Sequence, residues 1–362
     1  MLSEHDSIDE LGPLWSALGP STGNPLLSHE WFACAARSFH DAASLRTVLV
    51  KHSGELAAIA PLAIVRRHNV QWLEVVGTTA LHEPTGFVGQ DSSALDLACR
   101  TLLDFRRPIV LQRFDAADPL LAIFTAAARA RGKIFTLTAS GCPFVTIDTS
   151  WPQYFSSLSA RRRQDYRRAR RRLEQEGRVE VDIRCSSEAS VADELAEAMR
   201  VEAASWKGRA GSSLLNNESM RSFFQRLTLR LARRQALRMC FLRLNGTAVA
   251  AQICVEQDRR WWVLKIGYDE RWAALSPGVQ LMWDVLRHAF ERGLRSFELL
   301  GTAEEWLRIW TRSERAYRTL VFYPYNVRGV IALGGDTMRT FGRRMRWRSV
   351  NPPAQPSHRS QP

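Results

Sequence analysis

The same order of strand-like and helix-like segments occurs twice along this chain, and that repetition leaves few folds open. In the first half, two β-rich runs flank Ser53-Gly54 and are followed by a further strand, a loop, and helices that alternate with strands. In the second half, two β-rich runs flank Asn245-Gly246, the pair best suited to a type I′ hairpin turn, and the same order follows. The pattern predicts a mixed α/β fold with an internal duplication.

The repetition also predicts where the chain divides. Its 362 residues suffice for two domains of ordinary size, and the boundary falls near residues 148–151. We expect an N-terminal domain over residues 1–148 and a C-terminal domain over residues 149–330. A basic, partly disordered tail is expected over residues 331–362, because proline and serine accumulate near its end.

Local signals indicate where two helices of the second half begin. Ser150 is a good N-cap, and Gln153 supplies the partner for a capping box, so a helix is predicted from there to Gly177. Ser276 is expected to cap a later helix, and Pro277 suits its first helical position.

The net charge of +13 is concentrated in two segments. Residues 161–172 contain eight arginines and one acid, and residues 337–362 contain six arginines and no acid, so the rest of the chain is neutral. The first segment would cover every face of a helix, so most of its arginines must be solvated. They form either an ordinary basic surface or an arm for an anionic membrane surface or an acidic glycan. No nucleic-acid-binding motif is found, so a nucleic-acid partner is not expected.

Composition argues against several other classes of protein. No apolar run is long enough to span a bilayer, and the acidic N-terminus lacks the pattern of a secretory signal. We therefore expect a cytoplasmic protein, at most peripheral to the inner membrane face. The six cysteines are scattered without a C-x-x-C pair, which predicts buried free thiols and no metal site.

Five stretches carry a resemblance to a known family. They are "NPLLSHEWF" from residue 24, "YFSSLSARRRQDYRRARRRLEQEG" from residue 154, "EAASWKGRAG" from residue 202, "LKIGYDERWAALSPG" from residue 264 and "SFELLG" from residue 296. Together they resemble the BioF2-like or CelD-like branch of the acyl-CoA N-acyltransferase (GNAT) superfamily, a branch tied to exopolysaccharide genes. The resemblance implies tandem GNAT-like domains, of which the first is non-catalytic. The arrangement is also similar to the Fem-type aminoacyl transferases.

The resemblance further implies that acyl-CoA, in particular acetyl-CoA, binds as a co-substrate at the start of the helix predicted from Pro277. Free N–H groups and the dipole at a helix N-terminus can hold its pyrophosphate, although a well-capped helix without a ligand would look the same. The sequence departs from the family pattern where "AALSPG" replaces the usual phosphate-binding loop and where Leu307 replaces a lysine. The residues expected to bind coenzyme A are Leu275, Ser276, Gly278, Val279 and Gln280.

Three charged residues near this helix are candidates for catalysis. Asp269 can accept a proton from an attacking amine or hydroxyl, or it can simply close a turn. Lys265 lies on a predicted strand whose alternation can point it into a cleft, where it would pair with an anion; a surface position is the alternative. Glu298 lies within an apolar run, so its carboxylate needs a partner, either in a site or in an ion pair.

Four further residues complete the predicted site. Tyr268 can protonate a leaving thiolate, or its ring simply packs against neighbours. Glu202 and Trp206 lie one helical turn apart and can share a face that points to the substrate, with Lys207 beside them. The exposed end of a surface helix is the alternative for this group.

These observations predict an acyl-CoA-dependent acyltransferase that acts on an amine or hydroxyl of a small molecule or glycan, such as an exopolysaccharide or cell-envelope precursor. Catalysis is expected to depend on positioning, on stabilisation of the carbonyl oxyanion and on a general base. Two alternatives stay open. One is a Fem-like transferase that uses aminoacyl-tRNA, and the other is a non-catalytic binding or scaffold protein with a degenerate site.

Overall fold

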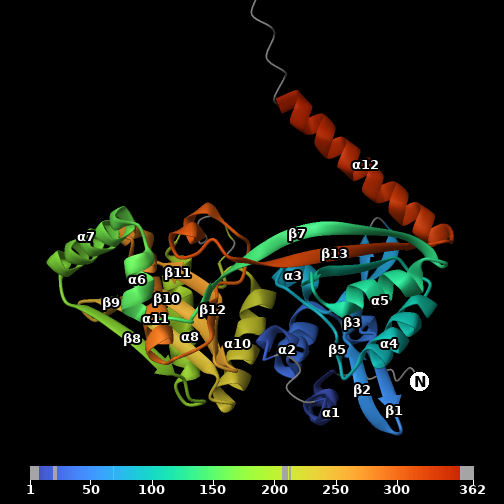
Figure 1. Ribbon diagram of the computed structural model, residues 1–362, viewed down its shortest axis with the longest axis horizontal. Helices are drawn as coiled ribbons and strands as arrows, with labels where there is room; N and C mark the ends of the chain where they lie inside the picture. The colour runs from blue at the N-terminus through green and yellow to red at the C-terminus, as the bar shows by residue number, and fades with distance from the viewer. Residues whose placement is uncertain (1–7, 19–22, 68, 206–210, 212, 351–362) are drawn as a thin grey trace, which may run out of the picture.

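The structure, a computed structural model, describes residues 8–18, 23–67, 69–205, 211 and 213–350, with side chains as far as residue 338. Two lobes are joined by two long strands that run side by side between them, β7 (Gly132–Thr146) and β13 (Glu314–Pro324) (Figure 1). Strands and helices alternate through both lobes, which confirms the predicted mixed α/β class.

Ten strands form one sheet that continues through both lobes. In order across the sheet they are β3 (Leu62–Arg67), β4 (Val70–Val75), β6 (Ile109–Asp115), β13, β7, β12 (Ser296–Glu298), β11 (Arg260–Tyr268), β10 (Thr247–Gln257), β9 (Leu237–Leu244) and β8 (Val179–Cys185). A smaller sheet in the first lobe consists of β1 (Val48–His52), β2 (Glu55–Ala60) and β5 (Val88–Gly89). Both predicted hairpins are present, with left-handed turn residues at Ser53 and Asn245.

The two central strands, β7 and β13, each pair with a strand from the other half of the chain. In each lobe a parallel pair, β4–β6 or β11–β12, is followed in the sheet by a long antiparallel strand from the other half of the chain. Strand β13 lies beside β6, and strand β7 lies beside β12. The order repeated in the sequence is therefore repeated in space. Strand β13 lies between two strands of the first half, so the lobes interlock, and the boundaries at residues 148 and 330 stay predictions.

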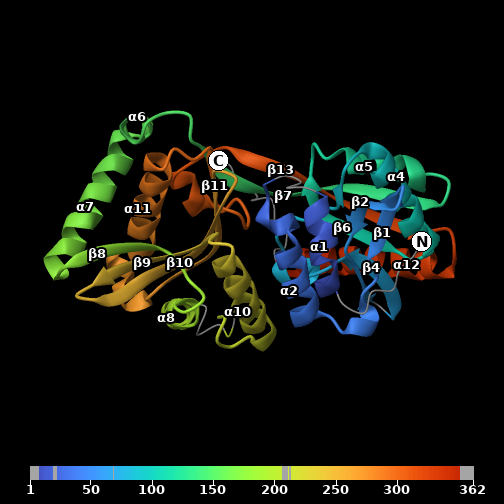
Figure 2. The same cartoon turned by 90° about the horizontal axis from the view of Figure 1, so that it is seen from below.

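Helices cover both faces of the strands in the second lobe. Along β10, Ala251 and Ile253 pack in the cluster that includes α8 and α10, whereas Ala250 and Cys254 pack in the cluster that includes α11. This alternation places α11 on one face of the sheet and α8 on the other, as Figure 2 shows. The helices of this lobe are α6 (Trp151–Ser157), α7 (Ala160–Glu176), α8 (Val191–Ala203), α10 (Glu218–Arg233) and α11 (Pro277–Glu291).

The first lobe packs against the second through α2 and α10. Trp31 on α2 meets Phe223 on α10 edge to face, with ring centroids 5.1 Å apart. The helices of the first lobe are α1 (Gly12–Ala17), α2 (His29–Phe39), α3 (Thr78–Leu81), α4 (Ser92–Asp104) and α5 (Pro119–Ala128). Short 3₁₀ segments are Ile8–Leu11, Pro25–Leu27, Ala42–Ser44, Glu270–Leu275 and Glu305–Ile309.

Two predicted helix starts need correction. The single helix predicted from Ser150 is two helices, because the chain is extended at Leu158 and the side chain of Ser159 caps α7 anew. The capping box of Ser150 and Gln153 itself is confirmed. Ser276 has a left-handed φ of 52° and its side chain makes no capping hydrogen bond, so α11 begins without a side-chain cap.

The predicted basic tail contains most of a long helix, α12 (Val327–Val350), which projects away from the two lobes (Figure 1). Its first turns pack on the first lobe, where Ala332 is buried near Trp72 and the Tyr323 hydroxyl donates to Asp336 at 2.6 Å. The Pro- and Ser-rich end predicted to be disordered lies outside the described residues. Among the helices that the structure describes, none is both long and apolar enough to cross a membrane. All six cysteines are free; five are buried as predicted, and Cys185 is exposed.

Candidate active site

A cavity of about 620 Å³ opens where β11 and β12 separate. The two strands pair only through residues 260–262 and 296–298. Beyond that pairing β11 continues along β10, while the chain after β12 turns away through Leu300 and Gly301, whose φ angles are 53° and 62°. A left-handed leucine is costly and persists only where its surroundings enforce it, often at functional sites. The diverging segments form two walls of the cavity, and the start of α11 forms a third.

Three of the five residues predicted to bind coenzyme A face this cavity. Ser276, Gly278 and Val279 line it, whereas Leu275 and Gln280 do not. The N–H groups of Val279 and Gln280 both donate to the Ser276 carbonyl, at 3.0 and 3.1 Å. Among the described residues nothing accepts the Gly278 N–H, which is therefore the donor that this helix start offers to a ligand. A β-carbon at residue 278 would stand 3.3 Å from the ring of Tyr268, so glycine permits the close approach of α11 to β11.

Lys265 and Glu202, both predicted as site residues, are brought together at the cavity. Lys265 lines it from β11, and its Nζ lies 3.4 Å from Oε1 of Glu202. Glu202 is 2% exposed at the end of α8, and its Oε2 accepts the Leu214 N–H at 2.8 Å. Helix α8 can approach this closely because residue 267 is glycine: a β-carbon there would be 2.7 Å from the Glu202 Cα.

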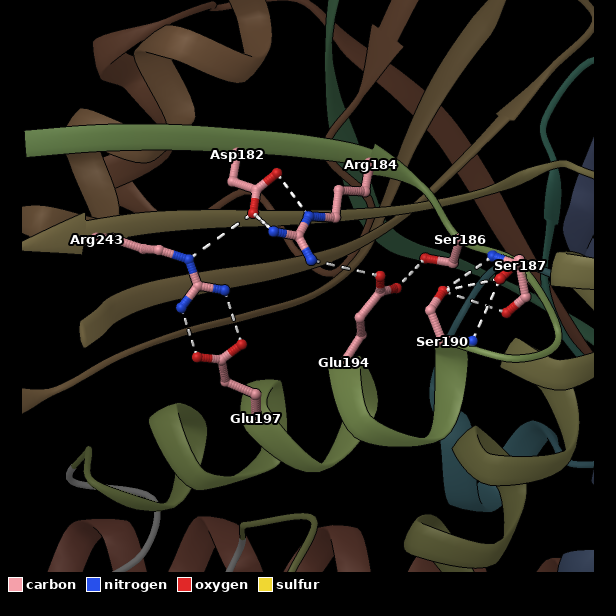
Figure 3. Close-up of polar contacts among 8 residues, drawn as sticks. All are labelled: Asp182, Arg184, Ser186, Ser187, Ser190, Glu194, Glu197 and Arg243. Carbon is pink, nitrogen blue, oxygen red and sulfur yellow. Dashed lines mark hydrogen bonds and ion pairs between the residues drawn. The ribbon is translucent and has the colours of Figure 1, made fainter. Parts of the chain in front are cut away.

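A polar network anchors α8 to the outer strands of the sheet (Figure 3). Arg243 on β9 forms a two-pronged ion pair with Glu197, with distances of 2.6 and 2.8 Å. Asp182 on β8 lies between Arg243 and Arg184, and Arg184 reaches Glu194 at 3.9 Å. Because α8 is fixed along its length, Glu202 at its far end is held against β11.

Two other predicted carboxylates lie outside the cavity lining. Asp269 accepts the Arg271 N–H at 3.0 Å and pairs with the Arg271 guanidinium at 2.6 Å. These contacts give Asp269 the turn-closing role that the sequence left open, and the hydrogen bond from the Arg271 side chain lowers the pKa of the carboxyl. Glu298 is 1% exposed and accepts two hydrogen bonds from Arg315, at 2.5 and 2.7 Å, so it ties β12 to β13.

The remaining predicted residues divide between the cavity and the undescribed segment. Tyr268 lines the cavity, with its ring against Gly278. Trp206 and Lys207 lie outside the described residues, next to Ser205, which lines the cavity. Across the part of the chain that the structure describes, no group of histidine, cysteine, aspartate or glutamate side chains is placed to hold a metal ion.

The first lobe contributes Glu83 to the cavity, a residue that the sequence analysis did not select. Its carboxylate accepts the Gly301 N–H at 3.2 Å. Burial raises the pKa of Glu83, while the charges of Arg113 and Lys265 act in the opposite direction. Glu83 follows the short helix α3 in the loop "LHEPTG", and an acid in a Pro- and Gly-containing loop was the only signal available in the sequence.

Arg113 on β6 fixes the junction between this loop and the chain after β12. It is 5% exposed, and its guanidinium donates to the carbonyls of His82 and Gly301, the latter at 2.5 Å. It also donates to the Ser140 carbonyl at 3.3 Å and to Cys142 Sγ at 2.9 Å. Two residues of the first lobe thus bind the backbone of Gly301: Glu83 accepts its N–H, and Arg113 donates to its carbonyl.

Residues 160–308 match the family model for an acetyltransferase (GNAT) domain. This range spans β8 to β12 and the walls of the cavity, apart from Glu83. No curated protein sequence matches the chain.

Several solved structures are similar over nearly the whole chain. One is the C-terminal domain of a putative lysylphosphatidylglycerol synthetase from Agrobacterium fabrum, with a TM-score of 0.56, 11% identity, and coverage of 91% of this chain and 96% of that one. A conserved protein of unknown function from Bacteroides thetaiotaomicron has a TM-score of 0.58 and 11% identity, with coverage of 89% of this chain and 99% of that one. FemX has a TM-score of 0.55 and 12% identity, with coverage of 89% of this chain and 97% of that one. At these identities the likeness shows the fold.

Residues 160–308 therefore form a GNAT-type acyltransferase domain. The cavity is lined by residues of that domain together with Glu83, and 89–91% of the chain has the fold found in FemX and in the domain of the putative lysylphosphatidylglycerol synthetase. The GNAT resemblance predicted from the sequence is confirmed over residues 160–308, and the similarity to Fem-type proteins is confirmed as a similarity of fold.

Proposed function

We propose that this protein transfers an acyl group from acyl-CoA, in particular acetyl-CoA, to an amine or a hydroxyl. The observation that carries the proposal is the separation of β11 from β12, which opens a cavity against the uncapped start of α11. A narrow cavity between diverging strands suits the extended arm of coenzyme A. The N–H of Gly278 and the positive end of the α11 dipole suit its pyrophosphate.

The residues around the cavity support transfer of an acyl group. Val263 and Leu299 are largely buried apolar side chains of the two walls, and they exclude water from the thioester. The ammonium group of Lys265 lies in the same cavity, where it favours the negative charge that develops on the carbonyl oxygen. The ion pair with Glu202 keeps that ammonium in place.

For the acceptor, we take up the BioF2-like or CelD-like resemblance and infer a small molecule or glycan that serves as an exopolysaccharide or cell-envelope precursor. Aminoacyl transfer from tRNA is the second candidate, and the fold shared with FemX supports it. Native mass spectrometry of the purified protein separates the two: retained acyl-CoA supports the first, and retained tRNA supports the second. A protein that binds neither and gives no thermal shift with acyl-CoA would be the scaffold alternative.

Replacing Gly278 with valine tests the coenzyme A site. The branched side chain would meet the Tyr268 ring and displace the start of α11, so CoA should bind roughly tenfold more weakly or worse, as expected for the loss of a charge-assisted hydrogen bond. Calorimetry with CoA measures the change. Gly334→Val is the matched control, because a β-carbon at residue 334 meets no other atom within 4 Å. Unchanged CoA affinity in a folded Gly278→Val protein would remove this site.

We also propose that α7 contacts an anionic membrane surface or an acidic glycan at the inner face of the membrane. The structure separates its arginines into two groups. Arg163 donates to two carbonyls at the end of α6, and Arg170 pairs with the buried Asp284 at 2.8 Å. The exposed arginines, which are free to meet such a partner, are Arg161, Arg167, Arg168, Arg171 and Arg172.

Glutamine at the four exposed positions 167, 168, 171 and 172 removes charge and leaves the Asp284 pair intact. We expect loss of co-sedimentation with vesicles of anionic phospholipid or with acidic polysaccharide, because charge neutralisation dominates such association. The control removes the same charge from exposed positions elsewhere: Arg66, Arg129, Arg226 and Arg312. Equal loss in both variants would show that only net charge matters, and the proposal for α7 would fail.

A further inference from the structure

We propose that Glu83 is the general base of the reaction, so that the first lobe supplies a catalytic group to the domain that binds the thioester. This inference rests on the proposed acyl transfer and assigns its proton-transfer step. Glu83 reaches the cavity from the loop between α3 and β5. Sequence position alone would assign it to the non-catalytic half.

Neighbouring groups hold the Glu83 carboxylate in the lining of the cavity that opens between β11 and β12. The Gly301 N–H donates to it from the chain after β12. Arg113 from β6 and Lys265 from β11 are the cations that act on it, and Cys142 from β7 is the further titratable neighbour. Burial raises the pKa of the Cys142 thiol to about 12, so that group stays neutral in the working range.

The other carboxylates near the cavity already have partners. Glu304, which also lines the cavity, accepts a hydrogen bond from Trp306 Nε1. Asp269 is paired with Arg271, and Glu298 is paired with Arg315. Glu202 is held by Lys265 and by the Leu214 N–H. No described residue forms an ion pair with Glu83, whose hydrogen bond to the Gly301 N–H leaves acceptor capacity on the carboxylate for a substrate proton.

Glu83 first takes up the proton of the acceptor and then gives it to the leaving thiolate. A neutral amine or a hydroxyl attacks the thioester carbonyl carbon, and its proton moves to the Glu83 carboxylate as the new N–C or O–C bond forms. The C–S bond then breaks, and the departing thiolate takes up the proton from the Glu83 carboxylic acid. Coenzyme A leaves as the thiol, and the carboxylate is restored. Geometry favours this route because Glu83 and Lys265 line the same cavity.

The proton affinity of Glu83 suits this role. Because burial raises its pKa in the folded protein, the folded state binds this proton more tightly than the unfolded state does. The free energy of unfolding therefore falls as the pH rises from the ordinary glutamate pKa through the raised value. A carboxyl whose pKa is raised by burial costs stability once the pH exceeds the ordinary glutamate pKa, as expected of a group kept for catalysis.

Glu83→Gln provides the test, because glutamine can still accept the Gly301 N–H but cannot take up a proton. We expect kcat to fall by roughly 10²–10⁴-fold, the usual contribution of a general base, with unchanged acetyl-CoA affinity. The fall of kcat/KM on the acidic side, which reports a base in the free enzyme, should disappear in the variant. The assay is release of CoA thiol from acetyl-CoA, with glucosamine as the probe acceptor and, separately, with water.

The matched control is Glu305→Gln, since Glu305 is exposed and lies outside the cavity lining. A second readout is thermal unfolding at pH 5 and pH 8: Glu83→Gln should gain stability relative to the native protein at the higher pH. A purely structural contact of Glu83 would instead leave kcat and its pH profile unchanged.

The outcomes separate the inference from the function on which it rests. A native protein that releases CoA thiol, with a Glu83→Gln variant within about threefold of it, far below the usual effect of a base, overturns the role of Glu83 and leaves acyl transfer standing. A native protein that neither binds acetyl-CoA nor releases thiol overturns the proposed function, and the inference with it.

Discussion

The two halves of the sheet start from the same arrangement and differ where their parallel strands end. In each half the second strand of the parallel pair, which lies nearer the centre of the sheet, is associated with a left-handed residue four positions after its first residue: Arg113 in β6 and Leu300 after β12, with φ angles of 54° and 53°. After Arg113 the chain stays in the sheet and pairs with β13. After Leu300 it leaves the sheet, and the cavity opens. The same left-handed backbone conformation thus occurs where one strand continues in the sheet and where the other chain segment leaves it.

The helices that lie between the two strands of each parallel pair in the sequence, α4 and α11, differ in the same sense. Helix α4 of the first half begins with a side-chain cap, in which Asp91 accepts the Ala94 N–H at 2.8 Å. That carboxylate satisfies the helix start and would repel a phosphate. Helix α11 of the second half begins at Ser276 without a side-chain cap, and its Gly278 lines the cavity. One helix start is closed to anions and the other is open.

The comparison shows that the first half contributes contacts to the cavity of the second half. Arg113 and Glu83 both reach Gly301, which belongs to the second half. The exchanged strands β7 and β13 make this possible, because they place the two halves edge to edge in one sheet. Deletion of the first lobe would therefore remove the contacts of Glu83 and Arg113 with Gly301 beside the cavity, in addition to the lobe itself.

The largest effect on this coupling is expected from Arg113→Met. Methionine fills similar space, but it cannot donate to the carbonyls of His82, Ser140 and Gly301 or to Cys142 Sγ, contacts that are partly or, at Cys142, fully buried. Buried unpaired acceptors cost about 1–3 kcal/mol each before relaxation, so we expect a loss of about 3 kcal/mol in the free energy of unfolding. Urea denaturation measures this loss, and calorimetry should show weaker CoA binding at the same time.

The matched control for this change is Arg312→Met, at an exposed position. Its effect on stability should stay within about 0.5 kcal/mol, as is usual for surface substitutions. If Arg113→Met were equally mild, the buried guanidinium would not be what joins the two halves, and the comparison drawn above would lose its main physical link.

Much of the fold was predictable because its signals are local. The turn pairs Ser53-Gly54 and Asn245-Gly246 specify hairpins, and alternating apolar residues specify strands. The exchange of β7 and β13 was not predictable, because pairing Leu320 with Thr136 depends on residues far apart in the sequence. Strand pairing at such separation leaves no pattern within either segment.

The same distinction explains which of the predicted residues the structure brings together at the cavity. Lys265 and Glu202 were selected for local reasons, strand alternation and helical spacing, and the structure places them together. Asp269 was also selected locally, but its partner Arg271 is only two residues away and gives it a turn-closing role. Glu83 was missed because its partner Gly301 belongs to the other half, and only the folded sheet brings them into contact.

The smallest expected effect tests the contrast between the two helix starts. Asp91→Ala should cost about 1 kcal/mol in the free energy of unfolding, because it removes a side-chain cap, and it should leave CoA affinity unchanged. Ser276→Ala should cost no more than about 0.5 kcal/mol, because that side chain caps nothing in α11. Urea denaturation of the two variants gives the difference directly. Equal losses would mean that both helix starts depend on their first side chain, and the open start of α11 would no longer distinguish the half that is proposed to bind coenzyme A.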